Sequence, residues 1–233
     1  MSDLSVAEAA QRLQVSPRRV RALLEEGRLE GRQVAGRWLL SSRNVERRQQ
    51  IAPQAGRPLS QASAWRVLAV VAHAEDALGE LAAPMRSRAR ARAAELRRCQ
   101  PADIPRHWQL VLGSRARITE FYAHPSVLKD LLDDLKIVRS GISAAHDHGA
   151  DLMVVGGAEG YIRSRDLPQV QAKYALNPDS GAHANVRLHV VEGDEASWLF
   201  SQRVAPAAVV AADLVERETP RDRAAGVKLA VGV

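Results

Sequence analysis

Apolar residues at the start of the chain recur at helical spacing. Positions 6, 9, 10 and 13 are apolar, which predicts an amphipathic helix over 4–13. Ser5 and Glu8 stand three residues apart at its beginning, the spacing of a capping box. After a break at 14–15, Ser16-Pro17 begins a second predicted helix over 17–26, because serine caps helices and proline is tolerated at the first helical position.

The following segment changes to short apolar runs. Residues 29–40 predict two strands around Ala35-Gly36, with Arg37 at the tip of the hairpin. A short helix over 42–50 is expected to close this unit. Residues 51–58 (IAPQAGRP) have no periodicity and are rich in proline and glycine, which is typical of a linker.

Beyond the linker the pattern is first helical and then mixed. We predict a helix over 60–73 and a helical segment over 85–98, in which arginine recurs at alternate positions around the helix axis. From residue 115 strands and helices alternate. Strands are expected at 118–123, around Tyr161 and at 186–191, and helices at 125–135, 140–148, 164–176, 205–217 and 220–230.

Two of these elements carry expectations about burial. The alternation of polar and apolar residues in 186–191 predicts a half-buried strand. In the predicted helix over 125–135, the apolar residues, which include Leu135, are expected to face inward.

Charge is distributed unevenly along the chain. The net charge is +6, with 18 basic and 10 acidic residues over 1–100 but 15 and 17 over 101–233. Such asymmetry is typical of a basic module that meets nucleic acid or an acidic partner. An arginine-rich composition is the other explanation, since 29 of the 33 basic residues are arginine. The apolar content of 46% predicts a folded chain in either case.

The second predicted helix leaves its arginines on the outside. They lie in its first turn and a half, the part of a recognition helix that reaches base edges in the major groove. Arginine there can bind guanine through two hydrogen bonds or clamp phosphates, and a helix N-terminus offers N–H groups to a phosphate. The predicted DNA-binding residues are Ser16, Arg18, Arg19, Arg21 and, at the hairpin tip, Arg37.

This N-terminal segment resembles the winged helix-turn-helix of the excisionase and MerR-like family. The resemblance is carried by 4–10 (LSVAEAA), Val15-Ser16 and 36–38 (GRW). It implies that the second helix enters the major groove of double-stranded DNA and that the hairpin contacts the backbone as a wing. The alternative is a small helical cap with a solvated arginine face.

The C-terminal half resembles the AbiEi family, the antitoxins of abortive-infection type IV toxin–antitoxin systems. The resemblance is carried by 140–145 (SGISAA), His148-Gly149, 204–206 (VAP), Asp213-Leu214 and 220–226 (PRDRAAG). It implies a repressor that binds the operator of its own operon and acts as antitoxin. An AbiEii-like nucleotidyltransferase toxin is then the partner.

Two other functions stay open. An excisionase-like architectural factor in recombination fits the N-terminal resemblance, although the near-neutral C-terminal half disfavours it. A protein-interaction module would use its arginines to bind an acidic partner. In each case we expect an α+β protein with a winged helix-turn-helix domain over 1–52, a helical connecting segment over 58–112 and a mixed α/β domain over 113–233.

The motifs of common enzyme classes are missing from the sequence. The glycine-rich residues 156–160 lack the Lys-Ser/Thr of a phosphate-binding loop and the spacing of a dinucleotide fingerprint. His146 and His148 stand two residues apart, so on a helix they point to different faces and form a poor metal pair. The single Cys99 excludes an internal disulfide, and its neighbours Arg97 and Arg98 are expected to lower its pKa. We therefore expect no enzyme, no catalytic residues, no cofactor and no metal.

The sequence also bears on location. The longest apolar runs have six residues, whereas a bilayer-spanning helix needs about 20. The first residues contain neither the charged nor the apolar region of a signal peptide. We expect a cytoplasmic protein without a membrane partner.

Overall fold

The chain folds into two compact units, Met1–Arg57 and Pro58–Val233. The computed structural model describes residues 3–13, 15–25, 29, 31–34, 36–42, 44–45, 59–79, 81–152, 156–178 and 183–233. The boundary between the units falls within the predicted linker 51–58, which lies outside the described residues.

Helices and a three-stranded antiparallel sheet make up the described part of the N-terminal unit. In chain order it comprises β1 (Asp3–Ser5), α1 (Val6–Leu13), α2 (Pro17–Glu25), β2 (Arg32–Val34) and β3 (Arg37–Ser41), and β3 is the middle strand. Leu4 pairs with Leu40 across β1 and β3, and α1 begins at Val6, directly after Ser5, the first residue of the predicted capping box. Of the helix predicted over 42–50, only 42, 44 and 45 are described, and these are helical.

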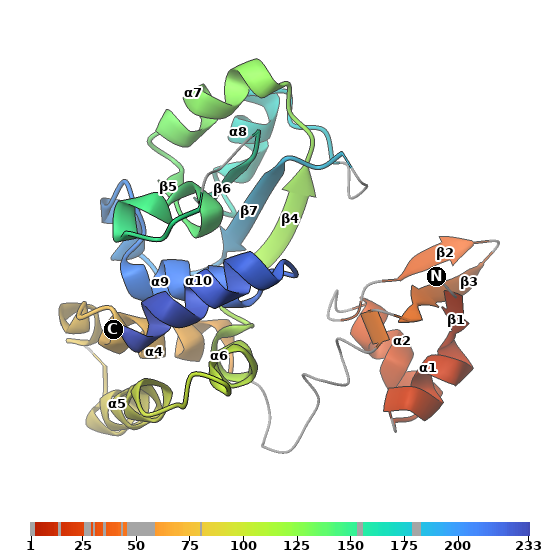
Figure 1. Cartoon of the computed structure of the whole chain (residues 1–233), viewed down its shortest axis with the longest axis horizontal. Coiled ribbons are helices and arrows are strands. Elements are labelled where there is room, and N and C mark those ends of the chain that lie inside the picture. Colours follow the sequence, from red (N-terminus) through yellow and green to blue (C-terminus); the bar gives the residue numbers. More distant parts are fainter. Residues whose placement is uncertain are drawn as a thin grey trace. The chain divides into compact units, whose positions relative to one another are not determined.

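The larger unit is built on a four-stranded mixed sheet (Figure 1). Its strands are β4 (Arg117–Phe121), β5 (Val138–Arg139), β6 (Ala158–Arg163) and β7 (Val186–Val191). They lie in the order β4-β7-β6-β5, with β6 and β7 parallel and the two other pairs antiparallel. The chain is therefore α+β, as the sequence predicts.

Helices cover both faces of this sheet (Figure 1). On one face lie α7 (Leu128–Asp133) and α8 (Leu167–Lys173). On the other are α4 (Gln61–Val71), α5 (Ala83–Arg97), α6 (Ile104–Leu112), α9 (Ala207–Val215) and α10 (Pro220–Val231). Short 3₁₀ helices lie at η1 (Glu75–Leu78), η2 (Pro125–Val127), η3 (Gly141–Ser143), η4 (His146–His148) and η5 (Leu199–Ser201).

Because both faces are covered, the central strand β7 is buried on both sides. Leu188 and Val190 face the core beneath α7 and α8, while His189 faces the opposite side and is equally buried. The prediction of a half-buried strand is therefore wrong. Alternation of polar and apolar residues here separates an apolar face from a face that carries the buried His189, and only Arg187 is partly exposed.

The segment over 58–112 does not form a separate connecting element. Trp65 of α4, Ala93 of α5 and Trp108 of α6 belong to the same core as Leu214 of α9. Helix α4 is buried on almost every side, so α5 and α6 alone do not cover it and the C-terminal helices must pack on it as well. Residues 58–112 and 113–233 consequently form one unit, and α6 is a helix that the sequence analysis does not predict.

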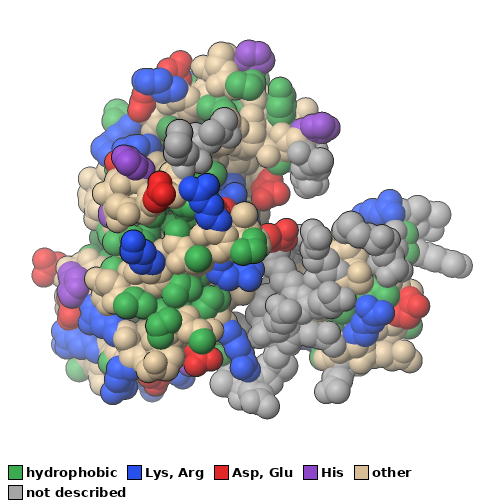
Figure 2. Space-filling view, viewed as in Figure 1, with side chains coloured by type: hydrophobic (Ala, Val, Ile, Leu, Met, Phe, Trp, Pro, Cys, Tyr) green, Lys and Arg blue, Asp and Glu red, His purple; other side chains and the backbone are tan. Residues whose placement is uncertain are grey.

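Arginines of α5 help to hold this unit together. The Arg97 guanidinium donates from Nη2 to the carbonyl of Val70 at 3.0 Å, near the end of α4. Arg86 donates from Nη1 to the carbonyl of Leu81 at 2.5 Å. In Figure 2 blue side chains gather at the lower left, where Figure 1 places α5. These two arginines therefore bind main-chain carbonyls at the end of α4 and in the loop before α5.

Two predicted helices are shorter or broken in the structure. The segment predicted over 125–135 is η2 followed by α7, which ends at Asp133, and Leu135 is 86% exposed instead of facing inward. The segment predicted over 140–148 is two 3₁₀ helices, η3 and η4, separated by a turn. Gly141 has φ +51, in the left-handed region that interrupts an α-helix. Among the described residues, no helix combines the length and apolar character needed to cross a membrane.

The end of α4 provides a test of local geometry. His73 has φ +57, its N–H donates to Val70 O at 3.3 Å, and the N–H of Ala74 donates to Ala69 O at 2.7 Å. This is the Schellman pattern, in which glycine is the favoured residue at the left-handed position. We expect His73→Gly to raise the free energy of unfolding by about 0.5–1 kcal/mol.

Thermal unfolding followed by tryptophan fluorescence measures this effect. The control is Ala72→Gly, one residue earlier at φ −85, where glycine only adds entropy to the unfolded chain and should lower the midpoint. A lower midpoint for His73→Gly would contradict the assignment.

Candidate functional site

Helix α2 is held by a cap at its beginning and by a buried apolar side. The N–H of Arg19 donates to Ser16 Oγ at 3.2 Å, and Pro17 is the first helical residue, as the sequence predicts. Val20 and Leu23 are buried in the core of the N-terminal unit. The preceding helix has a capping box in which Ser5 and Glu8 exchange hydrogen bonds of 2.7 and 3.2 Å, the first of which contributes most to lowering the Glu8 pKa.

The outer side of α2 carries three arginines. Arg18, Arg19 and Arg21 are all exposed. Within the part of the chain that the structure describes, the side chains of Arg18 and Arg21 form no hydrogen bond and no ion pair. Their guanidinium groups are therefore available to an external anion. Ser16 lies at the N-terminal end of the same helix, so four of the five predicted residues come together.

Strands β2 and β3 pair as an antiparallel hairpin, as the sequence predicts. Val34 pairs with Arg37. Gly36 has φ +76, which glycine adopts without the penalty of a side chain. Arg37 begins β3 directly after Gly36, but its side chain lies outside the described residues. The predicted contact of Arg37 therefore stays a prediction.

Comparison with known proteins bears on this same region. A family model described as a helix-turn-helix domain matches residues 4–50. The match supports a helix-turn-helix domain at the N-terminus. Such a domain suggests DNA binding, and the exposed side of α2 is its candidate DNA-contacting surface. No curated protein matches the chain, and no solved structure does.

A second group of polar side chains meets inside the larger unit. Arg115, between α6 and β4, is fully buried and donates to Asp213 at 2.7 Å and to Glu216 at 2.5 and 2.9 Å. Its Nε donates to the Tyr161 hydroxyl at 2.8 Å, and that hydroxyl donates to Asp213 at 2.6 Å. The Ser140 hydroxyl also donates to Asp213. We call these five residues the Arg115 cluster.

Glu159 connects this cluster to the neighbouring surface. Its carboxylate lies 2.9 Å from His189 Nε2, accepts from Arg217 at 2.9 Å, and accepts from the N–H of Ile142 at 3.1 Å. Burial raises the pKa of Glu159, but the hydrogen bond to His189 and the charge of Arg217 outweigh burial and lower the pKa to about 2. The sequence analysis did not single out Glu159, Arg115 or Tyr161, because their partners are far away in the chain.

The Arg115 cluster is enclosed. Its members are at most 1% exposed, except Glu216 at 9%. General acid–base or nucleophilic catalysis needs a side chain within hydrogen-bond reach of a substrate. The cluster therefore stabilises the fold. The expectation that the protein is not an enzyme stays a prediction.

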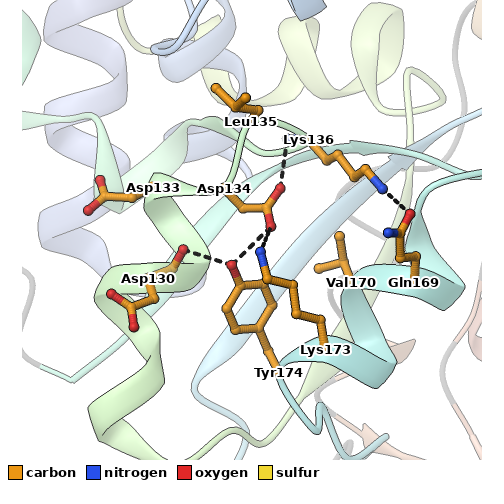
Figure 3. Close-up of a pocket in the computed structure, with 9 residues that line it drawn as sticks. All are labelled: Asp130, Asp133, Asp134, Leu135, Lys136, Gln169, Val170, Lys173 and Tyr174. Atoms are coloured by element: carbon orange, nitrogen blue, oxygen red, sulfur yellow. Dashed lines mark hydrogen bonds and ion pairs between the residues drawn. The ribbon is translucent and has the colours of Figure 1, made fainter.

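A pocket of about 450 Å³ lies elsewhere, between α7 and α8 (Figure 3). Asp134 accepts there from Lys173 Nζ at 2.8 Å and from the Tyr174 hydroxyl at 2.9 Å, and Lys136 donates to Gln169. These groups satisfy one another, so the pocket offers a ligand few unpaired polar atoms.

The remaining candidates concern metal binding and thiol chemistry. Among the described residues, no three histidine, cysteine, aspartate or glutamate side chains are placed to hold a metal ion. His148 Nε2 lies 2.7 Å from the carbonyl of Ala205, a contact within the fold. Burial raises the pKa of Cys99, opposite to the lowering expected from Arg97 and Arg98.

The cap on α2 makes a direct prediction. Ser16→Ala removes the acceptor for the Arg19 N–H, so α2 should lose about 1 kcal/mol of local stability. Ser16→Asp keeps an acceptor and is the matched control. Amide hydrogen exchange in the full chain measures the effect: protection of α2 should fall in the alanine variant alone. Equal exchange in both variants would show that the cap contributes nothing.

Glu159 predicts a pH dependence for the larger unit. Its folded-state pKa of about 2 lies below its ordinary value of 4.5, so its stabilising contribution is complete above pH 4.5 and is lost as pH falls toward 2. Glu159→Gln cannot bind this proton. We expect its free energy of unfolding, measured by urea titration, to fall less steeply over this range than that of the unchanged protein.

The control for losing a carboxylate is Glu192→Gln at an exposed position. It should keep the steepness of the unchanged protein. If Glu159→Gln keeps it as well, the charged state of Glu159 does not stabilise the fold.

Proposed function

We propose that this protein is a sequence-specific DNA-binding transcriptional repressor. Helix α2 is the recognition helix in the major groove, and the β2–β3 hairpin is a wing. The observation that carries this proposal is the pair Arg18 and Arg21: both are exposed on the outer side of α2 within a helix-turn-helix domain, and neither has a partner among the described residues.

The chemistry of the helix supports direct reading of bases. Val20 and Leu23 are buried in the core, which fixes the rotation of α2 about its axis. The arginines of its first turns therefore face outward. An arginine in that turn can donate two hydrogen bonds to the O6 and N7 of guanine. The capped N-terminus at Ser16 places positive partial charge near a phosphate. Arg37 follows the hairpin turn, where a wing meets the backbone.

Three arginine substitutions separate base reading from positioning. Arg18→Ala or Arg19→Ala should weaken binding to the preferred duplex by about 1–3 kcal/mol and blur the sequence preference. Arg37→Ala should weaken all duplexes similarly, because a phosphate contact carries no sequence information. Affinities for a preferred and a scrambled duplex, measured by fluorescence anisotropy at fixed salt, check both expectations.

Arg165→Ala, an exposed arginine of the larger unit, is the matched control. If Arg37→Ala changed the preferred sequence and Arg18→Ala did not, the roles of helix and hairpin would be reversed. If the protein bound no duplex at low salt, the proposed function would be wrong.

For the larger unit we propose the antitoxin role that the AbiEi resemblance implies, with a co-encoded nucleotidyltransferase-type toxin as the partner. The support is that the residues carrying the resemblance depend on one another. Ser140 donates to Asp213. A Cβ on Gly141 would lie 2.1 Å from the Glu159 carboxyl, and one on Gly226 would lie 2.7 Å from Val215 N. These motifs therefore describe one packed arrangement.

A co-expression growth assay beside a promoter–reporter assay tests this role. A chain lacking residues 1–57 should release the promoter yet still protect cells, at least in part, from the neighbouring gene product. Protection should be tested with exposed substitutions, because Asp213 and Leu214 are fully buried and their loss would disturb folding. A harmless neighbouring gene, or no protection by the full chain, would leave only the DNA-binding repressor.

The alternative is an excisionase-like architectural factor, which the resemblance over the helix-turn-helix domain favours. Such a factor bends its site, and bending costs several kcal/mol that extra contacts must offset. Energy transfer between dyes at the two duplex ends separates the functions: a large change on binding supports the architectural factor, and an unchanged value supports the repressor.

A further inference from the structure

Helix α5 of the larger unit carries more positive charge than its fold requires. Over 83–98 there are six arginines and one acidic residue, Glu95. Arg86 and Arg97 bind main-chain carbonyls, as described above. The other four are exposed and form what we call the α5 basic face: Arg88, Arg90, Arg92 and Arg98.

The members of this face differ in how firmly they are held. Arg90 pairs with Glu75 at 2.8 Å and Arg92 with Glu95 at 2.7 Å. The two arginine and two glutamate side chains of these pairs are 42–57% exposed. Ion pairs of this kind contribute about 0–1 kcal/mol, so a phosphate can replace the carboxylate at little cost. The side chains of Arg88 and Arg98 form no hydrogen bond or ion pair with any residue that the structure describes.

The position of the helix keeps this face outward. Ala89, Ala93 and Leu96 are buried in the core, which fixes the rotation of α5 about its axis. Arg88 and Arg98 are ten residues apart, so they lie about 15 Å apart along the helix. Measured along the axis of a duplex, that length spans about four phosphates of one strand.

The chemistry of the face favours a polyanion over an acidic protein. Protein interfaces depend on anchors that are buried in a well-packed pocket. Helix α5 has no aromatic anchor, and the arginines of the α5 basic face are exposed. A phosphate backbone needs only regularly spaced cations, and arginine suits it because its planar group donates two parallel hydrogen bonds.

We propose that the α5 basic face is a second DNA contact, which binds phosphates beside the site read by the helix-turn-helix domain without reading their sequence. This inference rests on the proposed DNA-binding function. The chain between Val45 and Leu59 has fourteen peptide steps, which can span at most about 50 Å, or one and a half turns of duplex. Once one unit is bound, this connection raises the effective concentration of the other at the flanking DNA.

The test compares two duplexes with the full chain. Both contain the preferred site, selected from random sequence; one is about 12 base pairs long, and the other extends the site to about 40. The unchanged protein should bind the longer duplex at least tenfold more tightly at low salt. The variant Arg88→Gln with Arg98→Gln should lose this gain on the long duplex and keep its affinity for the short one.

Salt dependence gives a second measurement of the same contact. Each phosphate contact adds about 0.9 to the log–log salt slope, so the double variant should lower the slope on the long duplex by about 2. The matched control is Lys129→Gln with Arg165→Gln, which removes the same charge from exposed positions on the other side of the sheet. It should behave like the unchanged protein. Circular dichroism verifies that both variants fold.

The outcomes separate this inference from the function it rests on. If no duplex is bound, the proposed function fails. If the α5 variant binds the short and long duplexes like the unchanged protein, the inference is wrong, the DNA-binding function stands, and the face belongs to another partner such as an acidic protein. If the control variant loses as much affinity as the α5 variant, the effect is one of net charge and the inference is again wrong.

Discussion

The larger unit depends on keeping one buried arginine fully paired. Arg115 is 1% exposed, and removing a guanidinium from water costs several kcal/mol unless its donors are satisfied. Its bonds to Tyr161, Asp213 and Glu216 tie β6 and the end of α9 to the segment between α6 and β4. Its own carbonyl accepts from Trp65 Nε1 at 2.7 Å, which adds α4. Loss of a partner would leave donors of a buried guanidinium without a hydrogen bond, so α4, the sheet and α9 have to dock together.

Arginine performs three different tasks in this protein, and each follows from its surroundings. In the core, the Arg115 guanidinium donates hydrogen bonds to two carboxylates and a phenol instead of to water. Arg86 and Arg97 of α5 bind main-chain carbonyls in the loop before α5 and at the end of α4. On α2, Arg18 and Arg21 have no internal partner among the described residues, which leaves them to an external anion. A net charge therefore says little about DNA binding until the internally paired arginines are set aside.

The two units also differ in how they are stabilised. The helix-turn-helix domain uses local devices, namely two helix caps, a tight hairpin and a small aliphatic core. The larger unit uses long-range contacts around a central helix, α9, whose residues from Ala208 onward are all buried. The larger unit therefore depends on contacts between segments that are far apart in the sequence.

The sequence by itself determined the local features of the N-terminal unit and the surface position of its arginines. The caps at Ser5 and Ser16 and the turn at Gly36 depend on residues at most three positions apart, and the exposure of Arg18 and Arg21 follows from helical periodicity. Only the tertiary structure decided that His189 and Glu159 are buried, that Leu135 is exposed, and that α4 to α6 belong to the same core as α9. The physical reason is distance along the chain. Arg115 and Asp213 are 98 residues apart, and no local pattern states which faces of a sheet or helix will be covered by elements that far away.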